Sequence, residues 1–482
     1  MIVSPTWAGK RYAVLGLARS GVAVVRALVA GGAGVVAWDS DVARRVALLS
    51  QAPPLQGRSW GGAVPGAALG ATSPTPNPVS GRSGSQPDLN SLGGYSPDTP
   101  EGEGLIEEGD PETHDLTGFD ALVVSPGVPL NRHPVAARAR AANVPILGDI
   151  ELFAQARPAL PRHKVVGITG TNGKSTTTAL IHHILQTAGV PSLMGGNIGL
   201  PILEQQPLPD GGVYVLELSS YQIDLTQSLD CDVAVLLNIT PDHLDRYDGF
   251  DAYAASKARL FAMQSPEHAA IIGIGDTPSA LIARSLSSRG EHLTKIAPGV
   301  CMDQSRWPSL QGPHNAQNAL AAIAVAQALG VSEAMIDAGL QSFAGLPHRM
   351  ERVRVRGGVT FVNDSKATNP ESAAPALAAF GRIHWIVGGK AKSDDLDACA
   401  PQFGNIACAY TIGAAGARFA AILEAHVPVE QSGDLATAVA RAARNAKPGE
   451  TVLLSPACAS FDQYRDFEDR GQQFRTLVEA LK

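Results

Sequence analysis

The chain has 482 residues, enough for two to four domains that each bury their own core. With 45% hydrophobic and 17% charged residues it has the composition of a folded globular protein, and a net charge of −7 argues against general nucleic-acid binding. Its five cysteines are odd in number and lack CxxC spacing, which argues against a disulfide framework or a cysteine metal cluster. Arg19 and Arg26 interrupt the first apolar stretch, and no run reaches the length of a membrane span. We expect a soluble, cytoplasmic protein.

The first 40 residues predict a strand, a helix and a second strand. Residues 11–17 are apolar, 20–30 have a helical pattern that ends at two glycines, and 35–39 form a second apolar run. The turn after the first strand reads G-x-A-x-x-G, and the second strand ends in Asp39, an acid that can accept a hydrogen bond from a ribose hydroxyl. Alone the motif is weak, because such a turn can also simply let a helix pack on a strand.

The composition changes between about 58 and 112, where Gly, Pro and Ser are frequent and apolar residues are few. Such a segment cannot bury enough apolar surface to fold, so it predicts a flexible insertion inside the first domain. Order is expected again at 121–127, a strand that ends in a glycine turn, and at 145–153. Pro158 and Pro161 then mark a linker.

Residues 165–178 read VVGITGTNGKSTTT and carry the strongest chemical signal. After a short apolar strand, Gly170 and Gly173 let the backbone turn with its N–H groups inward, and a helix follows at once. Lys174 supplies a charge for the β- and γ-phosphates, and the Ser175 hydroxyl is placed to bind Mg²⁺. The strict phosphate-loop pattern begins with one more glycine, so this loop is a variant. We predict that the chain binds a nucleoside triphosphate.

Two further strands of this central region deliver acids. The run 213–220 contains Glu217, and 233–246 contains Asp242 and His243. A carboxylate at the end of a buried strand is costly unless it is paired or metal-bound, and Mg²⁺ is the natural partner in a phosphate-loop domain. From the residues alone, a capping acid at Glu217 and an ordinary loop histidine at His243 remain alternatives.

The last third of the chain alternates strand, loop and helix, which predicts a mostly parallel sheet with helices on both faces. Ligands bind at the carboxyl ends of such strands, where this chain has DSKATN, GGKAKS and SPACAS. The strands are expected at 359–364, 384–389, 408–413 and 451–456.

Several segments are specific as an ordered set: GITGTNGKST, GGNIG, ELSS, TPDHLDR, LPHR, NDSKATN and SPACASFDQYRDFEDRG. Together they resemble the Mur ligases, ATP-dependent enzymes that add amino acids in peptidoglycan synthesis, and the last two resemble the member that adds D-glutamate. The resemblance implies an α/β protein of three domains. These are a Rossmann-like domain for the UDP substrate at 1–158, a central P-loop ATPase-like domain at 159–345, and a Rossmann-like domain for the amino acid at 346–482.

The resemblance also implies a reaction. ATP phosphorylates the terminal carboxylate of UDP-N-acetylmuramoyl-L-alanine, and the amine of D-glutamate attacks the acyl phosphate to leave an amide, ADP and phosphate. Two anions must meet, so positioning and cations should carry most of the catalysis. The expected enzyme is a cytoplasmic monomer that needs no nucleic acid and no membrane insertion. A sister ligase for another amino acid or for folate, an ATP-hydrolysing regulator or motor, and a nucleotide sensor remain alternatives.

For ATP and metal, the resemblance implies two Mg²⁺ sites, one at Ser175 and Glu217 and one at His243 and a carbamylated Lys257. A lysine on an amphipathic helix is ordinarily a solvated surface charge, and carbamylation needs a neutral amine with a lowered pKa. The implied catalytic residues are Lys174, Glu217, His243, Lys257 and Lys366. The implied ATP-binding residues are Gly170, Thr171, Asn172, Gly173, Lys174, Ser175, Thr176, Asn315, Asn318, Arg349 and Asp364.

For the other two substrates, the resemblance implies one site in the first domain and one in the third. Lys390 stands close to Lys392, so it stays open which lysine holds the amino acid, and Phe461 and Phe467 could equally be core residues. The implied residues for the UDP substrate are Arg19, Ser20, Asp39, Ser40, Gly127, Asn197 and His243. Those for D-glutamate are Thr368, Lys392, Ser460, Phe461 and Phe467.

Overall fold

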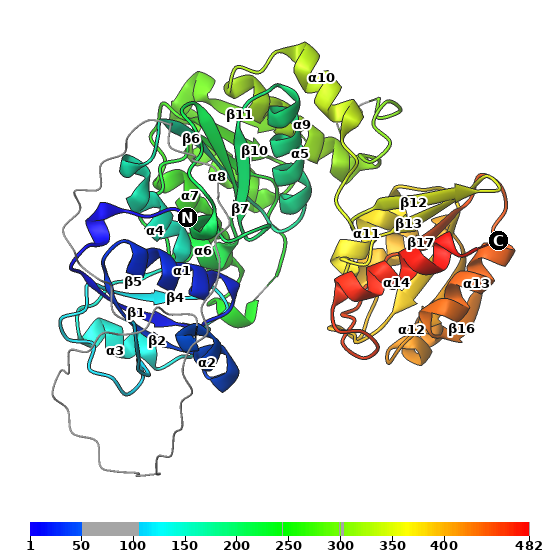
Figure 1. Ribbon diagram of the computed structural model, residues 1–482. Coiled ribbons are helices and arrows are strands. Elements are labelled where there is room, and N and C mark those ends of the chain that lie inside the picture. Colours follow the sequence, from blue (N-terminus) through cyan, green and yellow to red (C-terminus); the bar gives the residue numbers. More distant parts are fainter. Residues whose placement is uncertain (51–105, 243, 298, 300–302, 482) are drawn as a thin grey trace, which may run out of the picture.

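The computed structural model of the protein describes residues 1–50, 106–242, 244–297, 299 and 303–481. It contains three sheets that follow one another along the chain (Figure 1). The first two sheets lie against each other, and the third lies to one side, beyond the chain that follows helix α10 (Figure 1). The α/β fold of three parts that the sequence predicts is therefore confirmed.

The first sheet is entirely parallel, with the strand order β3-β2-β1-β4-β5. Its central strands are buried on both faces, which explains why they read as continuous apolar runs in the sequence. The elements are β1 (Arg11–Leu15), α1 (Arg19–Ala30), β2 (Gly34–Trp38), α2 (Val42–Ser50), β3 (Ile106–Glu108), β4 (Ala121–Val124), α3 (Val135–Ala141), β5 (Ile146–Leu147) and α4 (Asp149–Ala156).

Strand β3 corrects the predicted insertion at 58–112, because Ile106–Glu108 pairs in parallel with β2 at the edge of the first sheet. An edge strand is held by backbone hydrogen bonds on one side and buries little apolar surface. Its amino-acid composition therefore does not predict it. The side chain of Arg45 on α2 adds a hydrogen bond from Nε to Glu108 Oε1 at 2.7 Å. Residues 51–105 of the predicted insertion lie outside the described residues.

The second sheet is also parallel, with the order β11-β10-β9-β6-β8-β7. Helices α5 and α9 pack on one face, while α7 packs on the other. The elements are β6 (His163–Thr169), α5 (Lys174–Thr187), β7 (Ser192–Gly196), β8 (Gly212–Glu217), α6 (Ser220–Asp224), β9 (Val233–Leu236), α7 (Phe250–Ala262), β10 (Ala269–Gly273), α8 (Thr277–Ser285), β11 (Leu293–Ile296), α9 (Pro313–Ala328) and α10 (Glu333–Ser342).

The third sheet has the order β12-β13-β17-β14-β15-β16, and only β12 runs antiparallel to its neighbour among the described strands. Its elements are β12 (Glu351–Arg356), β13 (Val359–Asn363), α11 (Pro370–Ala378), β14 (Ile383–Gly388), β15 (Ile406–Ile412), α12 (Gly416–Leu423), β16 (Val429–Gly433), α13 (Leu435–Asn445), β17 (Thr451–Leu454) and α14 (Phe467–Glu479). Short 3-10 helices lie at Pro5–Trp7, Arg157–Ala159, Ile202–Glu204, Leu244–Arg246, Ser287–His292 and Asp397–Asn405.

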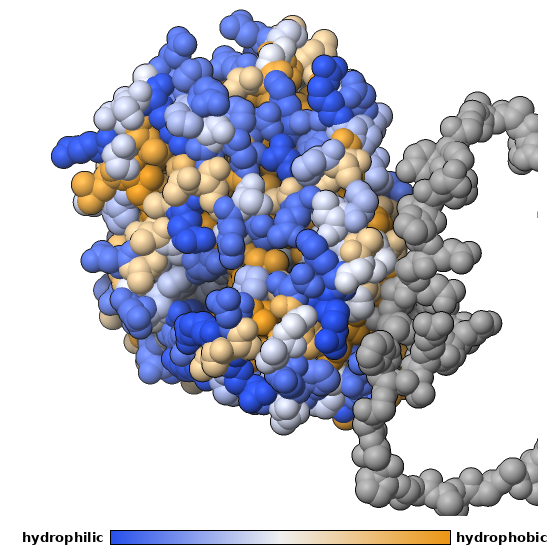
Figure 2. All heavy atoms as spheres, turned by 90° about the vertical axis from the view of Figure 1, so that its left-hand side faces the viewer, coloured by the Kyte–Doolittle hydropathy of each residue, from blue (hydrophilic) through white to orange (hydrophobic). Residues whose placement is uncertain are grey.

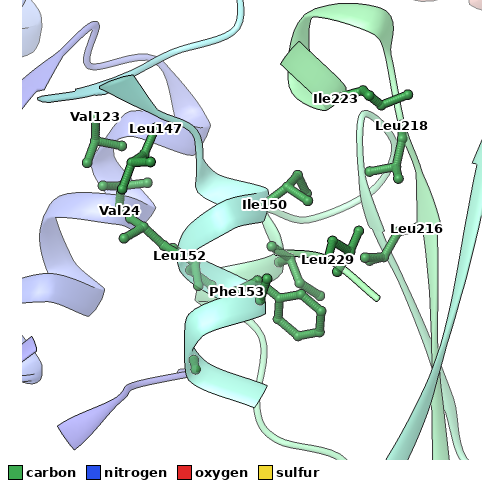
Figure 3. Packing of buried hydrophobic residues seen from close by; sticks show 14 of the residues in the cluster. Val24, Val123, Leu147, Ile150, Leu152, Phe153, Leu216, Leu218, Ile223 and Leu229 are labelled. Carbon is green, nitrogen blue, oxygen red and sulfur yellow. The ribbon is translucent and has the colours of Figure 1, made fainter. Parts of the chain in front are cut away.

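Helix α4 joins the cores of the first two sheets into one. Figure 3 shows Val24 and Leu147 of the first part on one side of this helix, and Leu216 and Leu229 of the second part on the other. Phe153 of α4 is fully buried between them. A fully buried side chain of this kind contributes about 1.5–3 kcal/mol, so this shared core fixes the two sheets relative to each other. The third sheet has cores of its own on its two faces.

The surface over the first two sheets is mixed. Figure 2 shows hydrophobic residues on this face as small patches between hydrophilic ones. Among the described residues, no helix combines the length and the apolar character needed to cross a membrane.

Candidate active site

The phosphate loop connects β6 to α5 with two glycines in backbone conformations that side chains rarely adopt. Gly170 has φ +151° and Gly173 has φ +86°. A Cβ atom on Gly173 would also clash with Asn318 Oδ1, so only glycine fits there. Lys174 Nζ donates hydrogen bonds to the Gly170 and Thr171 carbonyl oxygens, both at 2.8 Å. The side chain of Lys174 therefore lies against the loop, and it would have to leave these carbonyl oxygens to reach a phosphate.

Glu217, at the end of β8, faces the first turn of α5. It is 2% exposed, and its Oε2 accepts a hydrogen bond from Ser175 Oγ at 2.6 Å. Its other oxygen accepts from Asn197 Nδ2 at 3.0 Å, which joins the GGNIG loop to the same carboxylate. The capping acid considered from sequence is wrong, since Glu217 bonds across to a neighbouring element and α6 is capped instead by Ser219.

Arg349, from the segment that leads into the third sheet, reaches the same point. Its NH2 group donates to Ser175 Oγ at 2.8 Å. Burial lowers the pKa of Arg349, while the charges of Glu217 and Asp364 act in the opposite direction. The hydroxyl predicted to bind metal is thus shared by an acid and a guanidinium.

Lys257 is buried and not a surface charge, although it lies on an amphipathic helix. Its side chain is 1% exposed, and Nζ donates to the Gly170 carbonyl at 3.0 Å and lies 4.7 Å from the centre of the Tyr253 ring. Burial, followed by the charge of Lys174, lowers the pKa of Lys257 to about 7. A large share of the amine is therefore neutral near pH 7, as carbamylation requires.

The donors present fit a magnesium ion only with help from a ligand. Glu217 and Ser175 offer oxygen atoms, which Mg²⁺ prefers. Within the described residues, no group of three or more His, Cys, Asp or Glu side chains could hold a metal. Mg²⁺ commonly completes its shell with phosphate oxygens and water, and Ser175 and Glu217 suit that arrangement. His243, predicted for the second ion, lies outside the described residues.

A cleft of about 120 Å³ lies between the second and third parts of the chain. It brings together predicted ATP-binding residues from both sides. Asn318 Nδ2 donates to Asn315 Oδ1 at 3.1 Å, which links the two asparagines of α9. The predicted residues that line the cleft are Asn172, Gly173, Thr176, Asn315, Asn318, Arg349, Asp364 and Lys366.

Asp364 and Lys366 lie on the third-domain side of the cleft. Burial raises the pKa of Asp364 to about 7, although its carboxylate accepts from Ser455 Oγ at 2.7 Å and from the Met350 backbone at 3.1 Å. Burial, and then the charge of Arg349, lowers the pKa of Lys366 to about 8. Both side chains therefore change charge close to neutral pH.

The predicted D-glutamate residues gather at the carboxyl ends of β13, β14 and β17. Lys366 Nζ lies 3.8 Å from the centre of the Phe467 ring. Phe461 is 67% exposed, so the alternative that it packs in the core is wrong. The positive charge of Lys392 contributes to the lowered pKa of Lys366, whereas the Lys390 backbone is paired with Ala459. This favours Lys392 as the lysine nearer the site. Thr368 is half-buried and Ser460 is buried in the same loops.

The predicted UDP residues of the first domain follow β1, β2 and β4, whereas Asn197 follows β7 of the second sheet and His243 lies outside the described residues. Arg19 NH2 donates to the Gly199 carbonyl at 3.3 Å, so the first domain touches the GGNIG loop. Asp39 accepts from the Leu17 backbone at 2.6 Å and from Asp41 at 2.9 Å. Burial favours the neutral form of Asp39, but the hydrogen bonds from Asp41, Leu17 and Arg44 outweigh it and lower the pKa. Ser20 is half-buried and Ser40 is exposed beside them.

Comparisons with known proteins identify the family. A model of the Mur ligase middle domain matches residues 168–299, and one of the Mur ligase, glutamate ligase domain, matches 348–458. A UDP-N-acetylmuramoylalanine--D-glutamate ligase from Novosphingobium aromaticivorans is 56% identical across all of this chain and 97% of its own. One from Sphingopyxis alaskensis is 55% identical across all of both chains. The chain belongs to the Mur ligase family.

Solved structures share the fold of this Mur ligase. The UDP-N-acetylmuramate-alanine ligase MurC from Thermotoga maritima matches with a TM-score of 0.53 and 14% identity over 98% of this chain and all of its own. A pseudomurein peptide ligase type C from Methanothermus fervidus has a TM-score of 0.51 and 17% identity over the same shares. The family, the fold and the ligase class that the sequence predicts are thereby confirmed.

The site of this Mur ligase includes residues that sequence reasoning missed. Arg246 donates to the carbonyl of Val128 at 2.8 Å and to that of Gly127 at 3.3 Å, and so holds the predicted UDP loop against the second domain. His314 lines the cleft; burial lowers its pKa to about 4, and its Nδ1 has no hydrogen-bond partner among the described residues. Arg246 ends the TPDHLDR segment and His314 directly precedes Asn315, so closeness in sequence to predicted residues was the available signal.

Proposed function

We propose that this Mur ligase adds D-glutamate to UDP-N-acetylmuramoyl-L-alanine, driven by ATP, through an acyl phosphate, as a cytoplasmic monomer in peptidoglycan precursor synthesis. The observation that carries the proposal is full-length identity to ligases of that name, including one from Zymomonas mobilis at 52%. The cluster of cations at the third-domain loops supports it, because a dicarboxylate amino acid needs such partners.

The first proposed step is transfer of the γ-phosphoryl group to the alanine carboxylate. The backbone of Gly170–Thr176 holds the phosphates at the N-terminus of α5, and Lys174 moves from the loop carbonyls to a phosphate oxygen. Arg349 brings a second cation to the same place. Ser175 and Glu217 would hold Mg²⁺, which when bound neutralises charge on the phosphates.

The second proposed step forms the amide. The amine nitrogen of D-glutamate attacks the acyl carbon, the C–N bond forms, the C–O bond to phosphate breaks, and phosphate leaves with the electron pair. The amine must lose its proton, and Lys366, with a pKa of about 8, lies on the cleft where that proton is released. Lys392, Thr368 and Ser460 would hold the amino acid.

We further propose that Lys257 is carbamylated and contributes to a second Mg²⁺ site with His243. The neutral amine attacks CO₂, the N–C bond forms and one proton is released, which turns a cation into a carboxylate. The burial of Lys257 and its lowered pKa support the proposal. Incubation with ¹³C-labelled bicarbonate should give a carbamate resonance that is missing in Lys257→Met; equal spectra would contradict it.

The domain boundaries 1–158, 159–345 and 346–482 belong to the same proposal. The first sheet ends at Leu147, the second runs from His163 to Ile296, and the third begins at Glu351. These positions support the boundaries. Limited proteolysis that cleaves preferentially near 346 would agree with them.

The decisive experiment is amino-acid specificity. Phosphate release is measured with UDP-N-acetylmuramoyl-L-alanine, ATP, Mg²⁺ and one amino acid at a time: D-glutamate, L-glutamate, L-alanine or a diamino acid. Of these amino acids, we expect only D-glutamate to give sustained phosphate release. When hydroxylamine replaces the amino acid, we expect a hydroxamate to form. Faster release with another amino acid, or release without any sugar nucleotide, would overturn the proposal.

A further inference from the structure

Arg470, in the first turn of α14, is a cation enclosed by the protein. Its side chain is 1% exposed. Nε donates to Ser365 Oγ at 2.9 Å, and NH2 donates to the Ser365 and Cys458 carbonyl oxygens at 2.8 and 3.0 Å. The remaining group, NH1, has no hydrogen-bond partner among the described residues. All the atoms that it does bond are uncharged.

These contacts place Arg470 directly beneath the loops of the amino-acid site. Ser365 precedes Lys366, and Cys458 lies two residues before Ser460. A Cβ atom on Gly389, in the loop that leads to Lys392, would lie 3.2 Å from NH1. One guanidinium thus contacts the loops after β13 and β17 and lies against the loop after β14.

No acid among the described residues forms an ion pair with Arg470. Asp462 and Asp364 act on it only through their more distant charge, and burial, the larger effect, lowers the pKa of Arg470 to about 10. Asp364 offsets the charge of Arg470 only weakly, because burial raises the pKa of Asp364 to about 7 and so favours its neutral form. A buried charge without a counter-ion is strongly unfavourable, so its presence needs another source of compensation.

We propose that Arg470 is a positioning residue that sets the affinity for the amino-acid substrate, with its buried charge compensated by the anionic groups of a dicarboxylate bound above it. The guanidinium acts through the three loops and through its electrostatic field, and Lys392, Thr368 and Ser460 make the direct contacts. This inference rests on the proposed function. It assigns the preference for an acidic amino acid partly to a side chain that the substrate does not touch.

The test compares a neutral and a charged replacement. Arg470→Gln removes the charge and keeps an amide donor only near the position of Nε, which bonds Ser365 Oγ, and Arg470→Lys keeps the charge. Arg441→Gln, an arginine on α13 that bonds the Gln431 carbonyl and pairs with Glu430, is the matched control for loss of a cation from the same domain. KM for D-glutamate, ATP and the sugar nucleotide are measured for each, with thermal melting to verify folding.

In Arg470→Gln, we expect the KM for D-glutamate to rise about tenfold or more, with the other two KM values within about twofold of wild type. We expect Arg470→Lys to recover most of the loss and Arg441→Gln to match wild type. An unchanged KM for D-glutamate in Arg470→Gln, or an equal rise of all three KM values, overturns the inference.

If Arg470→Gln does not fold, the inference is judged from the KM for D-glutamate of Arg470→Lys. A KM for D-glutamate within about threefold of wild type supports a role of charge, and a rise beyond about tenfold shows that guanidinium geometry matters instead and overturns it. If wild-type enzyme uses no D-glutamate at all, the proposed function has failed, and these comparisons are not reached. The two failures are therefore distinguishable.

Discussion

Arg349 NH2 lies 2.8 Å from Ser175 Oγ, so a cation from the segment before the third sheet touches the first turn of the phosphate-loop helix. The same hydroxyl donates to Glu217, which makes Ser175 the meeting point of two parts of the chain. A cation in this position supplies positive charge where the transferred phosphoryl group would sit. The contact ties nucleotide chemistry to the placement of the third domain.

Removing this cation should slow the reaction. A hydrogen bond to a charged group is worth about 1.5–3 kcal/mol, so Arg349→Ala is expected to lower kcat/KM for ATP by about 10- to 150-fold. Arg306→Ala removes an exposed arginine that pairs with Asp337 and serves as the control. Steady-state phosphate release measures both. A variant of Arg349 that retained wild-type kcat/KM would show that its contact with Ser175 is not used in catalysis.

Glu217→Gln should change the response to magnesium. The amide keeps the shape and can still accept from Ser175, but it loses the negative charge that favours a divalent cation. We expect the Mg²⁺ concentration for half-maximal activity to rise about tenfold or more. Mutating groups that only orient metal ligands already lowers metal affinity by about that factor. Glu204→Gln, at an exposed ion pair with Arg26, is the control. An unaltered Mg²⁺ curve would remove Glu217 from the metal site.

Gly173→Ala should abolish nucleotide binding. Its φ of +86° disfavours any side chain, and the new Cβ would clash with Asn318. Gly189→Ala is a close control, because Gly189 has φ +73° but open space around its Cβ position. The control should cost about 1 kcal/mol of stability and leave binding intact. Titration calorimetry with a non-hydrolysable ATP analogue measures binding; equal affinities in both variants would refute the role of the clash.

Lys257 should make stability depend on pH in a definite direction. In the unfolded chain the amine has its ordinary pKa of 10.5, and in the folded protein about 7. The unfolded state therefore binds more protons between pH 7 and 10.5, so the free energy of unfolding rises with pH through that window. The difference arises because the folded protein buries a charge at low pH.

We therefore expect Lys257→Met to be more stable than wild type at pH 6, by on the order of a few kcal/mol, and the gap to shrink towards pH 10. Urea unfolding measures this difference in the free energy of unfolding. The buffer must be free of CO₂, because carbamylation would also change the stability of the wild type. A constant gap across this range would mean that the lysine titrates alike in both states.

The sequence predicts the parts of the site that lie in local motifs. Gly170 through Ser175 follow from one continuous segment, because the turn, the charge and the helix start are neighbours in the chain. The order of the three sheets follows from apolar runs that alternate with helical patterns. The roles of the individual residues remain predictions.

What the sequence does not predict depends on contacts between distant segments. Lys257 Nζ is held by the Gly170 carbonyl, 87 positions earlier in the chain, while Tyr253 covers it from one turn before on the same helix. Arginine is usually exposed, yet Arg470 is enclosed by Ser365, 105 positions away, and by Cys458, 12 positions away. Strand β3 likewise depends on backbone pairing with β2, which its own short sequence does not predict.

The core built around α4 has a thermodynamic consequence. Because Phe153 and its neighbours belong to both of the first two sheets, neither sheet can lose its packing without exposing apolar surface of the other. The third sheet buries its side chains within itself. Differential scanning calorimetry should therefore resolve two cooperative transitions in a chain of three sheets. ATP, which we propose binds at the boundary between the second and third sheets, should bring the two melting temperatures closer together.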